Sequence, residues 1–296
     1  MTTTVLTLVA NPATDIPFLT IVEKAQASLQ AHGAETGAPV WLREGVAADL
    51  IFDGTVQPEN LSDILNDVDY CLQPTLHRRK KLLLADMDST IITVECIDEL
   101  ADYAGVKDKV SAITEQAMRG ELDFNEAFRA RVAMLKGLEE SVLQRTFDER
   151  VTLTPGARTL IQTLRQNGAY TALVSGGFTF FTSRVRDSVG FHMHESNELL
   201  FENGRLTGEA AEPILNSAAK LDNLNRLIAE LGIDRQQSVA IGDGANDIPM
   251  IEAAGLGVAF HAKPKANEAA DATIRFGDLT TLLYYQGYTY TEFFSD

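Results

Sequence analysis

The chain has 296 residues, of which 45% are hydrophobic and 23% are charged, a composition typical of a globular protein with one large or two smaller domains. Its 42 acidic and 25 basic residues give a formal net charge of -17, which argues against nucleic acid or an anionic membrane surface as a partner. No apolar run approaches the roughly 20 residues that a membrane-spanning helix needs.

The cysteines and the N-terminus indicate a compartment. Cys71 and Cys96 are too few for a disulfide framework, and we interpret both as buried thiols of a reducing compartment. The first residues, MTTTVLTLVANPATDIP, lack the basic segment that precedes the apolar part of a signal peptide. These features predict a cytoplasmic protein.

Residues 1–76 predict a small α+β domain. Strands are expected at 4–10, 38–43, 47–54 and 69–74, and amphipathic helices at 16–33 and 59–68. The order βαββαβ is that of a ferredoxin-like unit. The basic cluster HRRKK, residues 77–81, comes next, and we expect it to be a solvated run of charges that links this domain to the rest of the chain.

Residues 81–296 predict a second domain of the α/β class, with a Rossmann-like core. Near-continuous apolar strands are expected at 81–86, 169–177, 238–244, 255–260 and 272–276, and they alternate with helices. This pattern favours a parallel sheet that is buried on both faces. The segment from about 94 to 151 has helical spacing and no convincing strand, so we expect a helical insertion that covers an edge of the sheet.

Polar motifs follow three of the expected strands. They are DMDST at 86–90, Ser-Gly-Gly at 175–177 and GDGAND at 242–247. Ligands of open α/β sheets collect beyond the carboxyl ends of the strands, so these motifs should line one crevice. Each of the first two motifs alone is common in turns, but all three in this order, with Lys220 between the last two, point to a site.

Crowded carboxylates repel one another, so they share a cation or one of them takes a proton. Mg²⁺ prefers hard oxygen ligands and commonly lies beside phosphate oxygens, while glycine N–H groups and a serine suit a phosphate. The motifs therefore predict a magnesium site that binds an acidic, phosphorylated substrate, with Lys220 completing the charge balance.

The same motifs resemble those of the haloacid-dehalogenase (HAD) superfamily, over residues 81 to about 276. DMDSTIITVECIDELA, LDFNEAFRARVAMLKGL and SGGFTFF are further similar to the phosphoserine phosphatases of that superfamily. The resemblance implies Mg²⁺-dependent hydrolysis of O-phosphoserine to serine and phosphate, the last step of serine biosynthesis. It also implies that the insertion at 94–151 acts as a cap.

The resemblance assigns roles to residues of the core. Asp86 would be the nucleophile that forms an aspartyl-phosphate, and Asp88 the general acid and base. Ser175, Gly176 and Lys220 would bind the phosphoryl oxygens. The metal would be bound by Asp86, the backbone carbonyl of Asp88 and Asp243, with Asp247 as a ligand or close to the metal.

The substrate's serine part would be recognised largely by the cap. Glu95 would meet the ammonium and Arg131 the carboxylate, with Phe124 lying against the substrate. Phe124, Phe128 and Arg131 are spaced i, i+4, i+7, so a helix would place them on one face. Gly177 and Asn246 complete the predicted substrate-binding set.

Some residues attract attention without fitting the site. His192 and His194 have a spacing that suits a metal, but we expect them to be loop residues. His261 is expected to be structural, and Lys263 is either a cation at the rim of the crevice or the start of a helix before Pro264.

Two alternatives stay open. The chain could be a phosphatase or phosphotransferase of the same superfamily that acts on another small phosphomonoester. Alternatively, the first domain resembles the ACT domains that bind amino acids and regulate metabolic enzymes, although its first loop, NPATDIP, lacks the expected glycine. That domain could then be regulatory, a degenerate scaffold or the interface of a homodimer.

Overall fold

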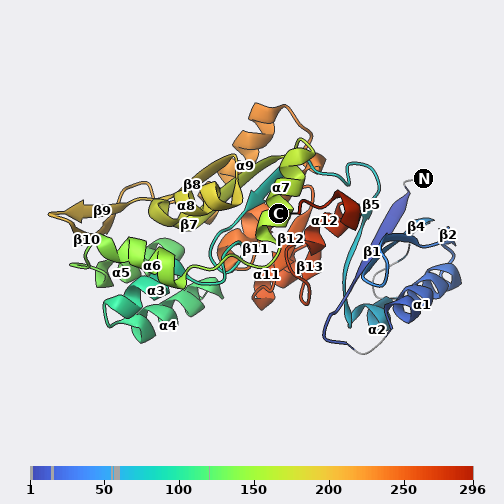
Figure 1. Ribbon diagram of the computed structural model, residues 1–296, viewed down its shortest axis with the longest axis horizontal. Helices are drawn as coiled ribbons and strands as arrows, with labels where there is room; N and C mark the ends of the chain where they lie inside the picture. The colour runs from blue at the N-terminus through green and yellow to red at the C-terminus, as the bar shows by residue number, and fades with distance from the viewer. Residues whose placement is uncertain (1–2, 15–16, 55, 57–60, 120, 296) are drawn as a thin grey trace.

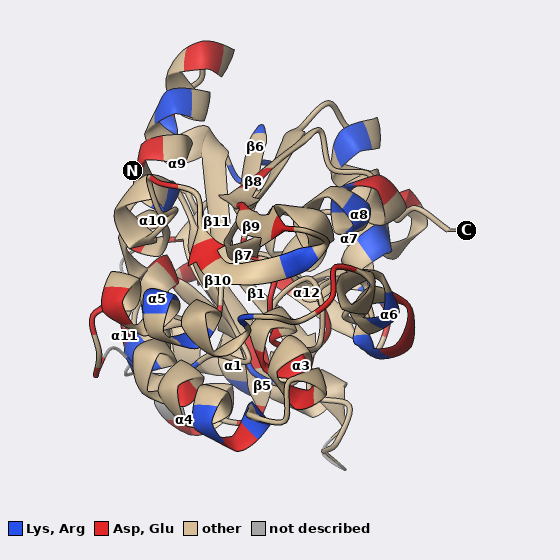
Figure 2. Ribbon diagram, turned by 90° about the vertical axis from the view of Figure 1, so that its left-hand side faces the viewer, with Lys and Arg blue, Asp and Glu red and all other residues tan. Residues whose placement is uncertain are grey.

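The computed structural model describes residues 3–14, 17–54, 56, 61–119 and 121–295. The expected helix start at Ile16 and the expected first residues of the helix at 59–68 lie outside these ranges. No helix among the described residues is long and apolar enough to cross a membrane. Figure 2 shows Lys and Arg residues interspersed with Asp and Glu along the helices of the segment 94–151.

The N-terminal part is an antiparallel sheet covered by helices. Its elements are β1 (Thr4–Ala10), α1 (Phe18–Ala31), β2 (Glu35–Thr36), β3 (Val40–Arg43), β4 (Ala47–Asp53), α2 (Ser62–Leu65) and β5 (Val68–Pro74). The strands are ordered β2-β4-β1-β5, and β3 also pairs with β4. The buried residues of α1 recur at helical spacing and pack against alternate residues of β1 and β4, because alternate side chains of a strand lie on the same face of the sheet. The two-residue strand β2 is an addition to the expected order.

The C-terminal part contains a parallel sheet with the strand order β13-β12-β11-β6-β7-β8. Its strands are β6 (Leu82–Ala85), β7 (Tyr170–Phe178), β8 (Met193–Asn197), β11 (Ser238–Gly242), β12 (Gly257–Phe260) and β13 (Ala272–Ile274). The residues of β6, β11 and β12 are all buried, which explains their continuous apolar sequence. This sheet has the α/β architecture that the sequence predicts.

Helices cover both faces of the parallel sheet (Figure 1). Leu83 and Ala85 of β6 face a cluster that includes α7 (Ala157–Gln166), α8 (Thr179–Val189) and α12 (Thr281–Tyr285). Leu82 and Leu84 face the opposite cluster, which includes α9 (Ser217–Leu231) and α10 (Ile248–Ala253). The remaining short elements are α11 (Pro264–Ala269) and the 3₁₀ turns η2 (Arg235–Gln237), η3 (Ala245–Asp247) and η4 (Tyr290–Glu292).

The segment 94–151 contains four helices in the part of it that the structure describes. They are α3 (Cys96–Tyr103), α4 (Lys107–Met118), α5 (Phe124–Met134) and α6 (Ser141–Arg150). A bridge between Ile92 and Leu153 brings the two ends of the segment together just outside these helices. The helices lie at one end of the parallel sheet (Figure 1), and we call them the cap.

One strand and one hairpin were not predicted from the sequence. His192 and His194 were expected to be loop residues; His192 lies outside any strand, but His194 belongs to β8 (Met193–Asn197) at the outer edge of the sheet. The hairpin of β9 (Leu199–Glu202) and β10 (Arg205–Ala210) follows and packs against α5. Neither has a clear apolar alternation, because β8 has a single buried residue and the hairpin lies mostly at the surface.

The interpretation of HRRKK as a solvated run of charges was wrong for Arg78 and Lys80, whereas Arg79 and Lys81 are exposed. Arg78 donates two hydrogen bonds to the buried Asp49, at 2.6 and 2.7 Å, and others to backbone carbonyls of Tyr284 and Tyr285. Lys80 is 6% exposed and donates to the carbonyl of Gln236 at 2.9 Å. The segment therefore lies between the N-terminal part and the C-terminal helices, where its cations have partners.

The two sheets are continuous, because β5 pairs antiparallel with β13 and joins them into one sheet of 11 strands. Asp69 at the start of β5 accepts hydrogen bonds from the backbone N–H groups of Arg275, Phe276 and Gly277. Arg275 in return donates to the carbonyls of Leu65 and Val68, both at 2.8 Å. We call this set of polar contacts, with Arg78 and Asp49, the junction.

Candidate active site

Residues at the carboxyl ends of three parallel strands meet at one edge of the sheet. Asp86 follows β6, Ser175 lies near the end of β7, and Asp243 follows β11. Because β6 lies between β7 and β11, these strand ends are neighbours. The side chains of all three residues are buried, as is that of Lys220 on the first turns of α9.

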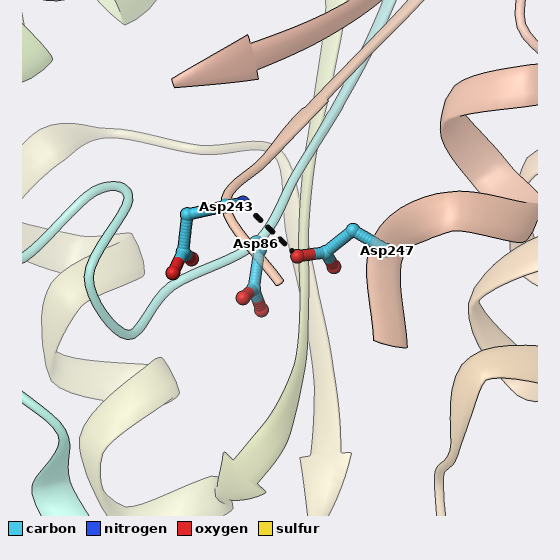
Figure 3. Close-up of side chains that lie close together, drawn as sticks. All are labelled: Asp86, Asp243 and Asp247. Atoms are coloured by element: carbon cyan, nitrogen blue, oxygen red, sulfur yellow. Dashed lines mark hydrogen bonds between the residues drawn. The ribbon is translucent and has the colours of Figure 1, made fainter. Parts of the chain in front are cut away.

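Three aspartates form a carboxylate cluster (Figure 3). Oxygen atoms of Asp86, Asp243 and Asp247 all lie within 4.8 Å of one another. The Nζ atom of Lys220 donates to Oδ1 of Asp86 and to Oδ1 of Asp247, both at 2.6 Å. The other oxygen of Asp247 accepts from the N–H groups of Asp243 and Gly244 at 3.1 Å. One lysine facing three carboxylates leaves an excess of negative charge, and oxygen ligands with this charge fit a divalent metal such as Mg²⁺.

Burial and the neighbouring charges together set the protonation of these groups. Burial and the nearby Asp247 carboxylate raise the pKa of Asp86 to about 7, although Lys220 acts in the opposite direction. Burial, then the neighbouring acids, raise the pKa of Asp243 well above its usual value. Burial alone would lower the pKa of Lys220, but Asp247 and Asp86 outweigh it and raise that pKa. The lysine is therefore a permanent cation, whereas the acids resist being ionised together.

Asp88 lies under the N-terminus of the first cap helix. Its Oδ1 accepts from the N–H of Cys96, the first residue of α3, at 2.8 Å, and its Oδ2 accepts from Oγ of Ser175 at 3.1 Å. Burial raises the pKa of Asp88, while these hydrogen bonds act to lower it. A carboxyl group with a raised pKa can carry a proton and later give it up, which is what general acid and base catalysis needs.

A cavity separates this edge of the sheet from the cap. Glu95 and Arg131 line it from the cap, and Asp86 and Asp88 line it from the strand end. Burial, followed by the Asp88 charge, raises the pKa of Glu95 to about 8, and Ser89 donates to Glu95 at 2.6 Å. The cavity therefore offers the acid Glu95 and the guanidinium of Arg131 next to Asp86 and Asp88, with the rest of the carboxylate cluster beside it.

Hydrogen bonds to other residues of the cap hold the side chain of Arg131 in place. It is 6% exposed, and its Nη1 donates to Oγ1 of Thr114 at 3.1 Å, while its Nε donates to the carbonyl of Ala127. Thr114 in turn donates to Asp98 at 2.7 Å. Burial lowers the pKa of Arg131, and the acids Glu95 and Asp98 oppose this effect. A guanidinium fixed in this way is suited to bind a carboxylate.

Two glycines allow the cap to approach the sheet closely. A Cβ at Gly176 would lie 2.7 Å from Cζ of Phe124, and one at Gly244 would lie 2.5 Å from Cε of Met118. Phe124 and Met118 line the cavity from α5 and α4. These glycines are therefore needed for close packing rather than for a positive φ.

The structure brings every sequence-predicted site residue to this one place. The cavity is lined by Asp86, Asp88, Glu95, Phe124, Arg131, Ser175, Gly176, Gly177 and Asn246. Lys220, Asp243 and Asp247 form the cluster beside it. The Oδ1 atom of Asn246 is buried and without a hydrogen-bond partner among the described residues, so an acceptor is available to a ligand there.

Several side chains that position these site residues were not predicted from the sequence. Thr90 donates to Asp243 at 3.0 Å, Thr114 orients Arg131, Met118 lines the cavity, and Asn197 donates to the carbonyl of Gly176 at 2.9 Å. Thr90 belongs to the DMDST motif and could have been found there. The others lie in segments without a motif, so spacing carried no signal for them.

The three histidines do not belong to the carboxylate cluster, whereas the backbone N–H of Lys263 donates to the carbonyl of Asp243 at 2.9 Å. His194 lies in β8 rather than in a loop, and its Nδ1 is 3.0 Å from the Thr182 hydroxyl, while His192 accepts from the backbone of Thr171. The Nε2 of His261 is 2.9 Å from the carbonyl of Gly277. Lys263 precedes the first residue of α11 and also pairs with Glu115 of the cap at 3.1 Å, so both interpretations of Lys263 describe it.

The parallel sheet, the aspartates at its carboxyl edge and the helical insertion above them define an α/β protein with an acidic site under a helical cap. A sequence profile described as haloacid dehalogenase-like hydrolase matches residues 83–252. The chain belongs to this family.

Several curated relatives of the chain are phosphoserine phosphatases. The chain is 50% identical over 202 residues to the phosphoserine phosphatase of Haemophilus influenzae, a match that covers 68% of this chain and 64% of that protein. Against the Streptomyces coelicolor phosphoserine phosphatase the identity is 47%, over 73% of this chain and 53% of the relative. The chain thus spans between about half and two thirds of the length of these curated relatives.

Among solved structures, a HAD family hydrolase, t0658, from Salmonella enterica serovar Typhi superposes with a TM-score of 0.84 and 32% identity. That match covers 96% of this chain and 98% of the other. A structure described as a phospho-aspartyl intermediate analogue of phosphoserine phosphatase gives a TM-score of 0.67 and 40% identity, over 70% of this chain and 99% of the other.

Proposed function

We propose that this chain is a Mg²⁺-dependent phosphatase that hydrolyses O-phosphoserine to serine and phosphate, the last step of serine biosynthesis. The observation that carries the proposal is the cavity itself, which is lined by Asp86, Asp88, Glu95 and Arg131, with Lys220 and the rest of the carboxylate cluster beside it. Phosphoserine carries a phosphate at one end and an ammonium and a carboxylate at the other. The relatives named phosphoserine phosphatase support the same assignment.

In the first half of the reaction, a carboxylate oxygen of Asp86 attacks phosphorus and forms an acyl phosphate, while the bond from phosphorus to the seryl oxygen breaks. Asp88 donates its proton to that oxygen, so serine leaves as a neutral alcohol. Ser175, the N–H of Gly176 and Lys220 bind the transferring phosphoryl oxygens. Asp86 and Lys220 already lie 2.6 Å apart, which places the cation beside the reacting carboxylate.

In the second half, Asp88 accepts a proton from water, whose oxygen attacks the phosphorus of the acyl phosphate. Phosphate leaves and the carboxylate of Asp86 is restored. The residues that would bind Mg²⁺ are Asp86 and Asp243, with the Asp88 carbonyl and Asp247. When bound, Mg²⁺ neutralises charge on the phosphate and on the acids.

Substrate selection is assigned to the cap. Glu95 binds the ammonium, Arg131 binds the carboxylate, and Phe124 lies against the substrate. Gly177 and Asn246 complete the wall, and the Oδ1 of Asn246 is the unpartnered acceptor described above. Because the polar groups of the cap are buried, a phosphate ester without an ammonium or a carboxylate leaves them unpaired, which weakens its binding.

The test is a side-by-side panel of small phosphomonoesters with purified protein and Mg²⁺. We expect the highest kcat/KM for O-phosphoserine, and loss of activity on chelation. A different preferred ester would favour the alternative, a HAD phosphatase of other specificity. Transfer of the phosphoryl group to a second substrate hydroxyl rather than to water would instead identify a phosphotransferase.

We further propose that residues 1–76 are an ACT-like domain and residues 81–296 the phosphatase domain, with the cap at about 94–151. The antiparallel sheet with two helices supports an ACT-like domain, but β5 continues into the sheet of the phosphatase part. Deletion of the first 75 residues would expose β13, so regulation is better tested on the full chain. Serine that still binds to the chelator-treated protein when phosphoserine saturates the cavity would indicate an effector site, whereas serine that phosphoserine displaces would indicate binding in the cavity only.

The homodimer and the cytoplasmic location are also proposals. Exposed apolar residues of the N-terminal part, Leu19, Val40, Trp41 and Ile51, support an interface there, which light scattering of the purified chain would test. Both cysteines are free and buried, as expected in a reducing compartment, and cell fractionation would test the location.

A further inference from the structure

Asn197 is a buried polar residue at the edge of the sheet where the candidate site lies. It is the last residue of β8, which pairs in parallel with β7, and its side chain is only 3% exposed. The ladder between β7 and β8 is irregular between Val174 and Phe178, the stretch that contains the Ser175–Gly177 turn. The regular pairing of backbone groups is therefore interrupted at the turn that is proposed to receive phosphate.

The side chain of Asn197 supplies hydrogen bonds where this ladder is interrupted. Its Nδ2 donates to the carbonyl of Gly176 at 2.9 Å and to that of Leu215 at 3.3 Å. Its Oδ1 accepts from the N–H of Leu215 at 2.7 Å. A primary amide can make this combination of two donations and one acceptance without bringing a charge into the interior.

Leu215 connects these bonds to the helix that carries the lysine. The next residue, Asn216, caps α9 by accepting from the N–H groups of Ala218 and Ala219. The carbonyl of Asn216 also accepts from the N–H of Lys220 at 3.1 Å. One side chain therefore joins the Ser175–Gly177 turn to the start of the helix that places Lys220 beside Asp86.

We propose that Asn197 is a positioning residue for phosphate: it fixes the Ser175–Gly177 turn relative to the N-terminus of α9, so that the turn and Lys220 face one phosphoryl group. The inference rests on the proposed phosphatase function. Asn197 does not itself line the cavity or belong to the carboxylate cluster, so it acts through Gly176, which lines the cavity, and Leu215. Its effect should be largest on ligands that use only the phosphate site.

The test compares Asn197→Leu and Asn197→Asp with Asn223→Leu, using the full chain with Mg²⁺. The leucine removes all three hydrogen bonds, whereas the aspartate keeps the shape and the acceptor but loses both donors. Asn223 is a matched control, because it is 4% exposed, lies on α9 and donates to the carbonyl of Ala219 without touching the turn. Thermal stability, kcat, KM and the inhibition constants of inorganic phosphate and serine are measured for each variant.

We expect both Asn197 variants to lower kcat about 10- to 100-fold and to raise the inhibition constant of phosphate about tenfold, since misplaced donors stabilise charge poorly. The inhibition constant of serine should stay within about twofold, because the cap is unchanged. Asn223→Leu should leave both inhibition constants unchanged even where its melting temperature falls. Asn197 variants that melt earlier but keep wild-type kcat and phosphate inhibition would overturn the proposal.

A measurement on the unaltered protein covers the case in which neither variant folds. The side-chain amide resonances of Asn197 should shift when inorganic phosphate is titrated in, and the absence of a shift at saturation would overturn the inference. The wild-type assay separates the two proposals. If the wild type does not hydrolyse phosphoserine, the proposed function fails. If the wild type has normal kinetics and the Asn197 variants are unaffected, only the role of Asn197 is contradicted.

Discussion

Two groups of buried charges lie at different places in the same sheet, and they are built in opposite ways. At the junction, Asp49 receives two hydrogen bonds from Arg78 and one from Thr7, and Asp69 accepts from three backbone N–H groups. At the carboxyl edge, Asp243 has a single side-chain donor among the described residues, Thr90, and it lies close to other acids. The buried carboxylates of the junction have several hydrogen-bond donors within the protein, whereas Asp243 at the carboxyl edge has few.

The contrast separates structural from functional charge. A buried carboxylate that is fully hydrogen-bonded holds two parts of a chain together, because removing either partner leaves a charge without compensation. A buried carboxylate cluster with too little positive charge needs a ligand to complete it. The same residue type, aspartate, therefore stabilises the fold at one place and at the other supplies a site that is costly without its ligand.

The largest expected effect is that of Asp86→Asn on catalysis. The amide cannot act as the nucleophile, so kcat for phosphoserine should fall by roughly 10⁴-fold or more. Because burial raises the pKa of Asp86 to about 7, the charge is costly in the metal-free protein. The melting temperature in the presence of a chelator should therefore be unchanged or higher. A clear loss of stability would show that Asp86 is also structural and would weaken the comparison.

Arg78→Ala should have the opposite profile. It leaves Asp49 buried without its main partner, so the free energy of unfolding should fall by about 3–5 kcal/mol, as for other broken buried pairs. The residual kcat of the folded fraction should stay within about threefold, because Arg78 is remote from the cavity. Denaturant unfolding and steady-state kinetics measure both quantities.

The neighbouring Arg79→Ala is the control for Arg78. Arg79 pairs with Glu292, and its side chain is 48% exposed, so its loss should cost no more than about 1 kcal/mol. Equal destabilisation by the two variants would mean that the junction is not stabilised by the buried pair.

Arg131→Ala tests the substrate end of the cavity. We expect KM for phosphoserine to rise about 10- to 100-fold, because a buried guanidinium that binds a carboxylate is removed. KM for a phosphate ester that lacks a carboxylate should change much less. Arg129→Ala, two residues earlier on α5 and paired with Glu212 at the surface, is the matched control and should change neither KM. Equal effects of Arg131→Ala on the two substrates would remove Arg131 from its assigned role.

The smallest expected effect is at the rim of the cavity. Lys263 and Glu115 connect the sheet to the cap at 3.1 Å, with side chains that are 36% and 42% exposed. A double-mutant cycle of Lys263→Met and Glu115→Gln, read out in kcat/KM, should give a coupling energy of about 0.2–1 kcal/mol. The coupling should vanish at high salt, since exposed charges are screened. A coupling that salt does not reduce would indicate a pair buried by cap closure.

Much of the candidate site could be predicted from sequence because its residues are local to strand ends. DMDST, Ser-Gly-Gly and GDGAND each follow an apolar strand, and parallel strands deliver their carboxyl ends to one edge. The family resemblance then added Glu95 and Arg131, which spacing alone could not have singled out. All of these residues lie at the cavity or in the cluster beside it.

The misses have a common cause. β8 is the outermost strand of the parallel sheet, and one residue of its five is buried, so its sequence MHESN has no apolar pattern. Because β8 was not predicted, its last residue, Asn197, was not recognised as the end of a further strand at the same edge of the sheet. HRRKK was misread because composition reports charge but not partners, and Asp49, the partner of Arg78, lies 29 residues away.

The sequence by itself determined the α/β alternation, the helical insertion and the acids at the strand ends, because strand and helix periodicity and the residues beside each strand are local properties. Only the tertiary structure decided which charges are satisfied. Lys220 lies between Asp86 and Asp247, Arg78 lies on Asp49, and Asn197 joins Gly176 to Leu215. Each of these contacts joins residues that are distant in the chain, and their strength depends on burial, which arises only when the sheet, its helices and the cap pack together.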